Sequence, residues 1–249
     1  MTNSYLIRPE LGFDSIVQHG GEVGCLLLHG LTASPVEMKQ LADFLHAKGY
    51  TISVPLLPGH GTHPDNLNRI HFSDWVQTAE DAVEALKTTC TQIFIAGESM
   101  GGLVAMRVAE LHPELAGVLL YSPALKARKI WAASFAKYFI KYINKATNGN
   151  GFVWSGYNVF PLGALDELHK LQKVVAKDLT EITQPTLLLM TQADTLVPQT
   201  VMEDIQKKIS SRIIDVHTFA DSDHCILLDK DKQTAFEMTL KFITNIIES

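Results

Sequence analysis

The stretch from Ile93 to Gly102 restricts the possible folds of this chain more than any other. It begins as an apolar run, typical of a buried strand, passes through Gly97-Glu98-Ser99-Met100-Gly101, and continues with apolar residues at helical spacing. Ser99 is therefore expected at a sharp strand-to-helix turn, where flanking glycines avoid collisions with neighbouring backbone. A serine that caps a helix gives a similar pattern, so the rest of the chain must decide between a cap and a nucleophile.

Length and composition limit the class of protein. The 249 residues, 46% of them hydrophobic, suffice for one large α/β domain. A net charge of −6 without a basic stripe argues against a nucleic-acid partner. Residues 1–9 lack a signal-peptide pattern and no apolar run has the length of a membrane span, so we expect a cytoplasmic protein without stable membrane insertion.

Strand and helix patterns alternate along most of the chain. Apolar runs at 24–28, 50–55, 93–98, 117–122, 185–191 and 213–219 are separated by amphipathic segments at 34–48, 73–88, 100–111 and 201–209. Strands that are apolar throughout indicate a mostly parallel sheet with helices on both faces. Before them, a strand or hairpin is expected up to about residue 21. Ser34-Pro35-Val36-Glu37 has the pattern of a helix start in which the glutamate reaches back to the amide of the capping serine.

The alternation stops between residues 123 and 177, where no clear strand is found and aromatic residues are frequent. We interpret 123–177 as a small cap inserted into an α/β core formed by 1–122 and 178–249. Its aromatic residues can line an apolar acyl channel or form the core of an ordinary helical subdomain. The aromatic surface of the cap is also a candidate for a homodimer contact or for contact with a lipid interface.

Three residues in the order serine, aspartate, histidine carry the candidate chemistry. A serine hydroxyl needs a base to remove its proton, and the base needs a partner that fixes its tautomer. Asp194 follows the strand at 185–191 and His224 follows the strand at 213–219, so both are expected at the edge where Ser99 lies. Asp221, Asp223 and Glu98 are alternative partners for the base, although Asp223 adjoins His224 and cannot easily turn back onto its ring.

These motifs resemble those of the α/β-hydrolase superfamily. The resemblance rests on Gly97-Glu98-Ser99-Met100-Gly101, Leu28-His29-Gly30-Leu31, Asp194-Thr195-Leu196-Val197-Pro198 and Ser222-Asp223-His224. The Leu-His-Gly-Leu-Thr-Ala-Ser-Pro stretch, the short chain and the small central insertion are similar to those of bacterial carboxylesterases and monoacylglycerol lipases. Gln192-Ala193 departs mildly from the pattern, because many relatives have glycine before the acid.

The resemblance implies Ser99, Asp194 and His224 as the catalytic residues and the backbone amides of Leu31 and Met100 as an oxyanion hole. We expect Leu31, Trp154 and Val197 to contact the substrate, and His29 to be a turn histidine behind the oxyanion hole. No cofactor and no metal are expected. The histidines and aspartate between residues 60 and 71 match no metal-ligand spacing.

The sequence thus predicts a serine hydrolase that cleaves carboxylic esters of small to medium acyl chain, as a carboxylesterase or monoacylglycerol lipase does, through an acyl-enzyme. A small-molecule ester is the expected partner. Aryl-ester hydrolysis of the feruloyl type and C–C bond hydrolysis remain alternatives with the same three residues, because one fold serves many chemistries. A non-catalytic ligand-binding member of the fold is a third alternative.

Overall fold

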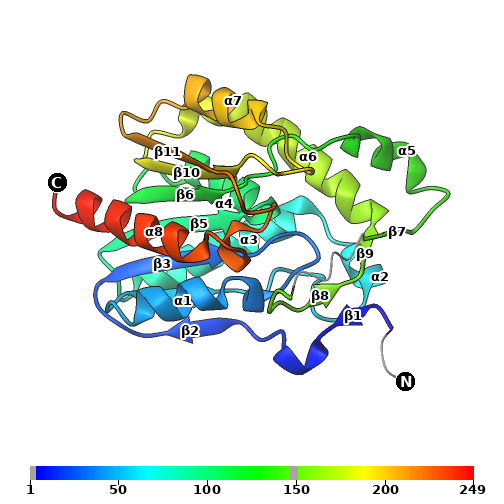
Figure 1. The fold of residues 1–249 in the computed structure, drawn as a ribbon, viewed down its shortest axis with the longest axis horizontal. Coiled ribbons are helices and arrows are strands. Elements are labelled where there is room, and N and C mark those ends of the chain that lie inside the picture. Colours follow the sequence, from blue (N-terminus) through cyan, green and yellow to red (C-terminus); the bar gives the residue numbers. More distant parts are fainter. Residues whose placement is uncertain (1–3, 146–150) are drawn as a thin grey trace.

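The computed structural model describes residues 4–145 and 151–249, and its centre is a seven-stranded sheet (Figure 1). In spatial order the strands are β11 (Ile214–Phe219), β10 (Thr186–Thr191), β6 (Gly117–Tyr121), β5 (Gln92–Glu98), β3 (Val23–Leu28), β4 (Thr51–Val54) and β2 (Ile16–Gln18). Every neighbouring pair is parallel except β2 and β4. The predicted mostly parallel sheet is confirmed.

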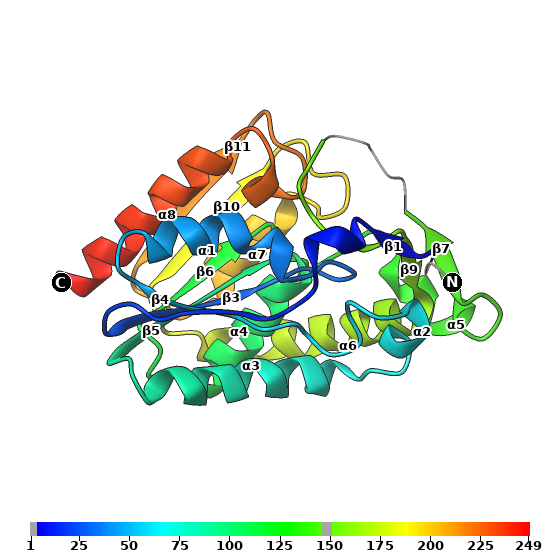
Figure 2. The same cartoon turned by 90° about the horizontal axis from the view of Figure 1, so that it is seen from below.

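Helices cover both faces of the sheet (Figures 1 and 2). One face carries α3 (Phe72–Lys87), α4 (Met100–Leu111), α6 (Leu162–Asp178) and α7 (Thr200–Lys208), and the other carries α1 (Lys39–His46) and α8 (Lys232–Ile247). Along β3, Leu26 and Leu28 belong to the apolar core on the side of α3, α4, α6 and α7. Cys25 and Leu27 belong to the apolar core on the side of α1 and α8. Burial on both faces explains why these strands are apolar at every position.

The segment before β3 differs from the expected hairpin. β1 (Leu6–Ile7) pairs antiparallel with β8 (Gly156–Tyr157), and β2 pairs antiparallel with β4. The 3-10 turn η1 (Pro9–Leu11) lies between β1 and β2. The hairpin alternative is therefore wrong, because each short strand finds its partner far along the chain.

The helix start at Ser34 also differs in detail. The side chain of Ser34 accepts a hydrogen bond from the amide of Val36, as a capping serine does, and η2 (Pro35–Glu37) precedes α1. Glu37 does not reach back to Ser34. Its carboxylate accepts a 2.6 Å hydrogen bond from the amide of Gly30 instead.

The predicted cap contains short strands, so the expectation of none is wrong. β7 (Tyr142–Asn144) pairs antiparallel with β9 (Val159–Pro161), and η3 (Ile130–Ala132) and α5 (Ala133–Ala136) precede them. Phe135, Tyr138 and Phe139 are exposed, whereas Tyr157 is wholly buried. α6 packs against α4 and contributes to the apolar core.

The remaining short elements are α2 (Pro64–Leu67), η4 (Leu179–Glu181) and η5 (Ile226–Leu228). Among the helices of residues 4–145 and 151–249, none is long and apolar enough to cross a bilayer.

Candidate active site

The carboxyl ends of the central strands meet at one edge of the sheet. The register pairs Leu28 with Gly97, Glu98 with Tyr121 and Thr191 with Phe219. The loops that follow these strands therefore emerge side by side, as expected for the ligand-binding edge of a parallel sheet.

Ser99 occupies a strained turn between β5 and α4. Its φ of 55° and ψ of −114° are unusual for any residue other than glycine. A Cβ added to Gly97 would lie 2.2 Å from the carbonyl carbon of Gly101, and one added to Gly101 would lie 2.1 Å from the carbonyl oxygen of Leu28. Only glycine fits at these two positions, which holds the serine at the tip of the turn.

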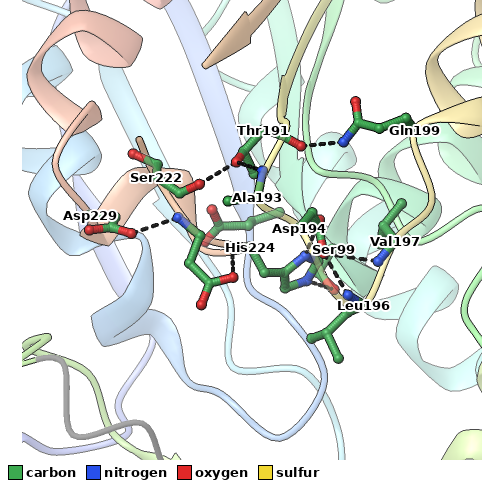
Figure 3. A network of polar contacts seen from close by, with 12 residues as sticks. Ser99, Thr191, Ala193, Asp194, Leu196, Val197, Gln199, Ser222, His224 and Asp229 are labelled. Atoms are coloured by element: carbon green, nitrogen blue, oxygen red, sulfur yellow. Dashed lines mark hydrogen bonds and ion pairs between the residues drawn. The ribbon is translucent and has the colours of Figure 1, made fainter. Parts of the chain in front are cut away.

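The structure brings Ser99, His224 and Asp194 into one hydrogen-bonded chain (Figure 3). Nε2 of His224 lies 2.8 Å from Oγ of Ser99, and Nδ1 of His224 lies 2.7 Å from Oδ2 of Asp194. The three residues come from the loops after β5, β10 and β11. This is the geometry in which an imidazole removes the proton of a hydroxyl while a carboxylate stabilises the imidazolium.

The alternative carboxylates are used elsewhere. Asp223 accepts a 2.8 Å hydrogen bond from the backbone amide of His224, Glu98 accepts one from the amide of Leu227, and Asp221 is exposed. Within the described part of the chain, Asp194 is the one carboxylate at ion-pair distance from the His224 ring.

The loop after β10 keeps Asp194 ionised. Burial by itself would raise the pKa of Asp194, but the hydrogen bond and charge of His224 and the amides of Val197 and Leu196 hold it below its usual value. The amides of Leu196 and Val197 donate to Oδ1 at 2.8 and 2.9 Å, respectively, which leaves Oδ2 for the imidazole.

Thr191 links this loop to the histidine loop. Its hydroxyl donates to the carbonyl of Ser222 and accepts from the amide of Ala193, while its own carbonyl accepts from the side chain of Gln199 (Figure 3). The two loops that carry Asp194 and His224 are thereby fixed relative to each other.

We call His29–Thr32, the turn after β3, the oxyanion turn. Nδ1 of His29 donates to the carbonyl of Gly30 at 2.9 Å, and its Nε2 accepts from the amide of Leu57 at 3.1 Å. The amide of Thr32 donates to Nε2 of His60 at 3.0 Å. Among the described residues, the amides of Leu31 and Met100 have no acceptor, so both are free to bind an oxyanion.

The expected substrate contacts lie around this edge. Leu31 belongs to the oxyanion turn, and Val197 follows Asp194, although its side chain is buried. Trp154 is half-buried, and the ammonium of Lys145 stands 4.8 Å from the centres of both the Trp154 and Phe160 rings. Lys145 is not predicted at the site, because nothing in the sequence around it indicates that this part of the chain lies beside Trp154.

The possible metal ligands noted in the sequence do not gather. His60 is buried and bonded to Thr32, and His63 accepts from the amide of Asp65 at the start of α2. In the ranges that the structure describes, one group of possible ligand atoms lies close together, that of Glu37, Glu98 and Cys225. Neither Glu37 nor Cys225 is predicted at the site from the sequence.

The chain is similar to proteins named as lipases and esterases. It is 31% identical over 236 residues to the thermostable monoacylglycerol lipase of Bacillus sp. (strain H-257), covering 93% of this chain and 94% of the lipase. It is 24% identical to a carboxylesterase of Bacillus subtilis (strain 168), covering 91% and 94% of the two chains. A structure from the study of the metagenome-derived lipolytic enzymes LipS and LipT aligns with a TM-score of 0.90 at 29% identity, covering 94% of this chain and 98% of the other.

The fold and these matches define a serine hydrolase with the α/β-hydrolase fold. The model of the Hydrolase_4 family, described as serine aminopeptidase, S33, matches residues 23–152, and the chain belongs to this family. The resemblance to bacterial carboxylesterases and monoacylglycerol lipases is confirmed, as is the prediction of an enzyme of the carboxylic ester hydrolase class.

Proposed function

We propose that the enzyme hydrolyses monoacylglycerols and other carboxylic esters of small to medium acyl chain, with Ser99, His224 and Asp194 as its catalytic triad. The observation that carries the proposal is the hydrogen-bonded chain from Ser99 Oγ through both His224 nitrogens to Asp194 Oδ2. The names of the relatives, a monoacylglycerol lipase and a carboxylesterase, support the choice of substrate.

In the first half of the reaction, His224 removes the proton of Ser99 as its oxygen attacks the ester carbonyl. The amides of Leu31 and Met100 stabilise the negative charge on the carbonyl oxygen, and Asp194 stabilises the imidazolium. The imidazolium then protonates the leaving alcohol, which gives the acyl-enzyme. In the second half, His224 removes a proton from water, which attacks the acyl group and releases the acid and Ser99.

For substrate contacts we propose Leu31 beside the carbonyl and Trp154 and Val197 along the substrate. Leu31 supplies an apolar side chain next to its own donor amide. The Trp154 ring is covered by Lys145, so this contact combines an apolar face with a cation.

The test is a p-nitrophenyl ester series from acetate to palmitate, measured beside monoacylglycerols, a feruloyl ester and an amino-acid p-nitroanilide, with Ser99→Ala as the blank. We expect turnover to peak at short or medium chains, to include monoacylglycerols, and to vanish in the variant. Labelling by a fluorophosphonate without ester turnover would indicate a different scissile bond. Neither labelling nor turnover in the folded protein would favour the non-catalytic alternative.

A homodimer through the cap is a further proposal, supported by the exposed aromatic residues Phe135, Tyr138 and Phe139. Analytical ultracentrifugation of the protein and of Phe139→Glu tests it, because a dimer formed there dissociates when a charge replaces the ring. The division into core and cap stays a prediction, and limited proteolysis tests it. The cytoplasmic location also stays a prediction, and cell fractionation tests it.

A further inference from the structure

Two buried glutamates behind the oxyanion turn take no part in the mechanism described above. Glu98 has no exposed surface and Glu37 is almost fully buried. A carboxyl oxygen of each and Sγ of Cys225 all lie within 4.8 Å of one another. Two carboxylates at this separation in the interior repel strongly unless a proton lies between them.

Glu37 holds the oxyanion turn. Its Oε2 accepts a 2.6 Å hydrogen bond from the amide of Gly30, in the peptide that precedes the donor amide of Leu31. A Cβ added to Gly30 would lie 3.3 Å from this oxygen and 3.5 Å from Cβ of Ser99. Gly30 is therefore clamped between the Glu37 carboxylate and the nucleophile, and movement of Glu37 would move the Leu31 amide.

Glu98 holds the histidine loop. It directly precedes Ser99, and its Oε1 accepts a 3.2 Å hydrogen bond from the amide of Leu227, in the turn that follows His224. Its Oε2 is buried and, within the described residues, has no hydrogen-bond partner. A proton on this oxygen turns it into a donor, for which the neighbouring Glu37 carboxylate is an acceptor.

The surrounding charges indicate which carboxyl carries the proton. Burial raises the pKa of both glutamates, and the charge of Glu37 and, more weakly, that of Asp194 raise the pKa of Glu98 further. The Gly30 amide, Lys145 and His224 oppose the rise for Glu37. Burial and the two carboxyls also raise the pKa of Cys225, so its thiol stays protonated.

We propose that Glu37 and Glu98 share one proton and act as a positioning pair, which holds the oxyanion turn and the histidine loop in register with Ser99. Glu37 carries the negative charge and fixes the Leu31 amide, and Glu98 carries the proton and fixes the loop of His224. The inference about rate rests on the proposed ester hydrolysis, whereas the shared proton is a property of the folded protein.

Loss of the shared proton leaves two buried anions that push the oxyanion turn and the histidine loop apart. Activity of the native enzyme is therefore expected to fall at alkaline pH. In Glu98→Gln, the amide keeps an acceptor for Leu227 and provides a donor toward Glu37 without a titratable proton. We expect this variant to keep kcat at neutral pH within about threefold of the native value and to lack the alkaline fall.

Glu37→Gln keeps an acceptor for Gly30 but removes the charge, and Glu98→Leu removes both the acceptor and the proton. We expect kcat to fall about 10-fold or more in each, with KM nearly unchanged, because the Leu31 amide acts mainly on the transition state. The measurement is kcat and KM for p-nitrophenyl butyrate from neutral to alkaline pH, normalised to the active sites titrated by a fluorophosphonate.

Difference infrared spectroscopy tests the proton without any turnover. The C=O stretch of a protonated carboxyl is expected in the native protein at about pH 8 and is expected to be missing from Glu98→Gln. Absence of this difference would overturn the shared proton, whether or not the protein hydrolyses esters. If activity still fell at alkaline pH in Glu98→Gln, the positioning role would be wrong. Equal losses of kcat in Glu98→Gln and Glu98→Leu would also overturn it and would leave the pair only a structural role.

Discussion

Asp194 and His224 are 30 residues apart in the sequence, yet Oδ2 of the aspartate lies 2.7 Å from Nδ1 of the histidine. The position of the carboxylate is fixed, because its other oxygen, Oδ1, accepts hydrogen bonds from the amides of Leu196 and Val197. The imidazole therefore has its Nδ1 proton fixed on one side and its Nε2 presented to Ser99 on the other.

Replacing Asp194 by asparagine tests this arrangement. An amide can donate to Nδ1 and so favours the tautomer with the proton on Nε2, which cannot accept the proton of Ser99. We expect kcat to fall about 10⁴-fold at neutral pH with KM little changed. Steady-state kinetics on p-nitrophenyl butyrate measure the loss, and an unchanged circular dichroism spectrum is the control. A loss of less than about tenfold would mean that another group orients His224.

The strain at Ser99 predicts a stability gain when the residue becomes glycine. A φ of 55° with a ψ of −114° costs a non-glycine residue on the order of 1–3 kcal/mol, and glycine removes this cost while adding some entropy to the unfolded chain. Ser99→Gly is expected to exceed Ser99→Ala in free energy of unfolding by about 1 kcal/mol. Urea denaturation of the two inactive variants measures the difference, and equal values would show that the turn is not strained.

Much of the fold could be predicted from the sequence because the patterns that indicate it lie within short stretches of the chain. The buried parallel strands are apolar at every position, and Gly97 and Gly101 are required by contacts within one strand, turn and helix. The order of Ser99, Asp194 and His224 then followed from the order of the strands, since the loops after parallel strands share one edge.

Contacts between distant loops could not be predicted from the sequence. Ser34-Pro35-Val36-Glu37 matches a capping box, but residues 35–37 form a 3-10 turn. The carboxylate of Glu37 accepts a hydrogen bond from the buried amide of Gly30 instead. The amide of Gly30 and the carboxylate of Glu37 lie close together only after the chain has folded. Likewise, Phe139 and Tyr157 belong to the same aromatic region, yet the first is 89% exposed and the second is wholly buried. The ring of Tyr157 stacks on that of His60 and its hydroxyl donates to the carbonyl of Gly59, and no local pattern indicates these contacts with a loop much earlier in the chain.

A buried pair of hydroxyls joins the cap to the segment after the oxyanion turn. Oγ of Ser34 lies 2.6 Å from Oγ of Ser155, which also donates to the carbonyl of Gly12 at 2.9 Å. Either single change to alanine leaves a buried polar atom short of a partner, at a cost of about 1–3 kcal/mol in unfolding free energy. The double variant should lose less than the sum of the two single losses, by about 1 kcal/mol. Additive losses would show that the two hydroxyls do not interact in solution.

The two histidines behind the oxyanion turn predict how stability depends on pH. Nε2 of His29 accepts from Leu57 and Nε2 of His60 accepts from Thr32, so neither ring can take a second proton without breaking a hydrogen bond. Burial lowers the pKa of His29 to about 4 and holds the pKa of His60 well below its usual value, with the charge of His29 adding to the effect on His60.

As pH falls below about 6.5, the unfolded chain binds protons at both histidines whereas the folded protein binds none, so stability decreases with acidification until about pH 4. The part due to His29 is on the order of 3 kcal/mol. Urea denaturation between pH 7 and pH 4 measures the slope, with His60→Gln as the comparison, because glutamine can accept from Thr32 and does not titrate. We expect a shallower slope in His60→Gln, and the same slope in both proteins would contradict a neutral, buried His60.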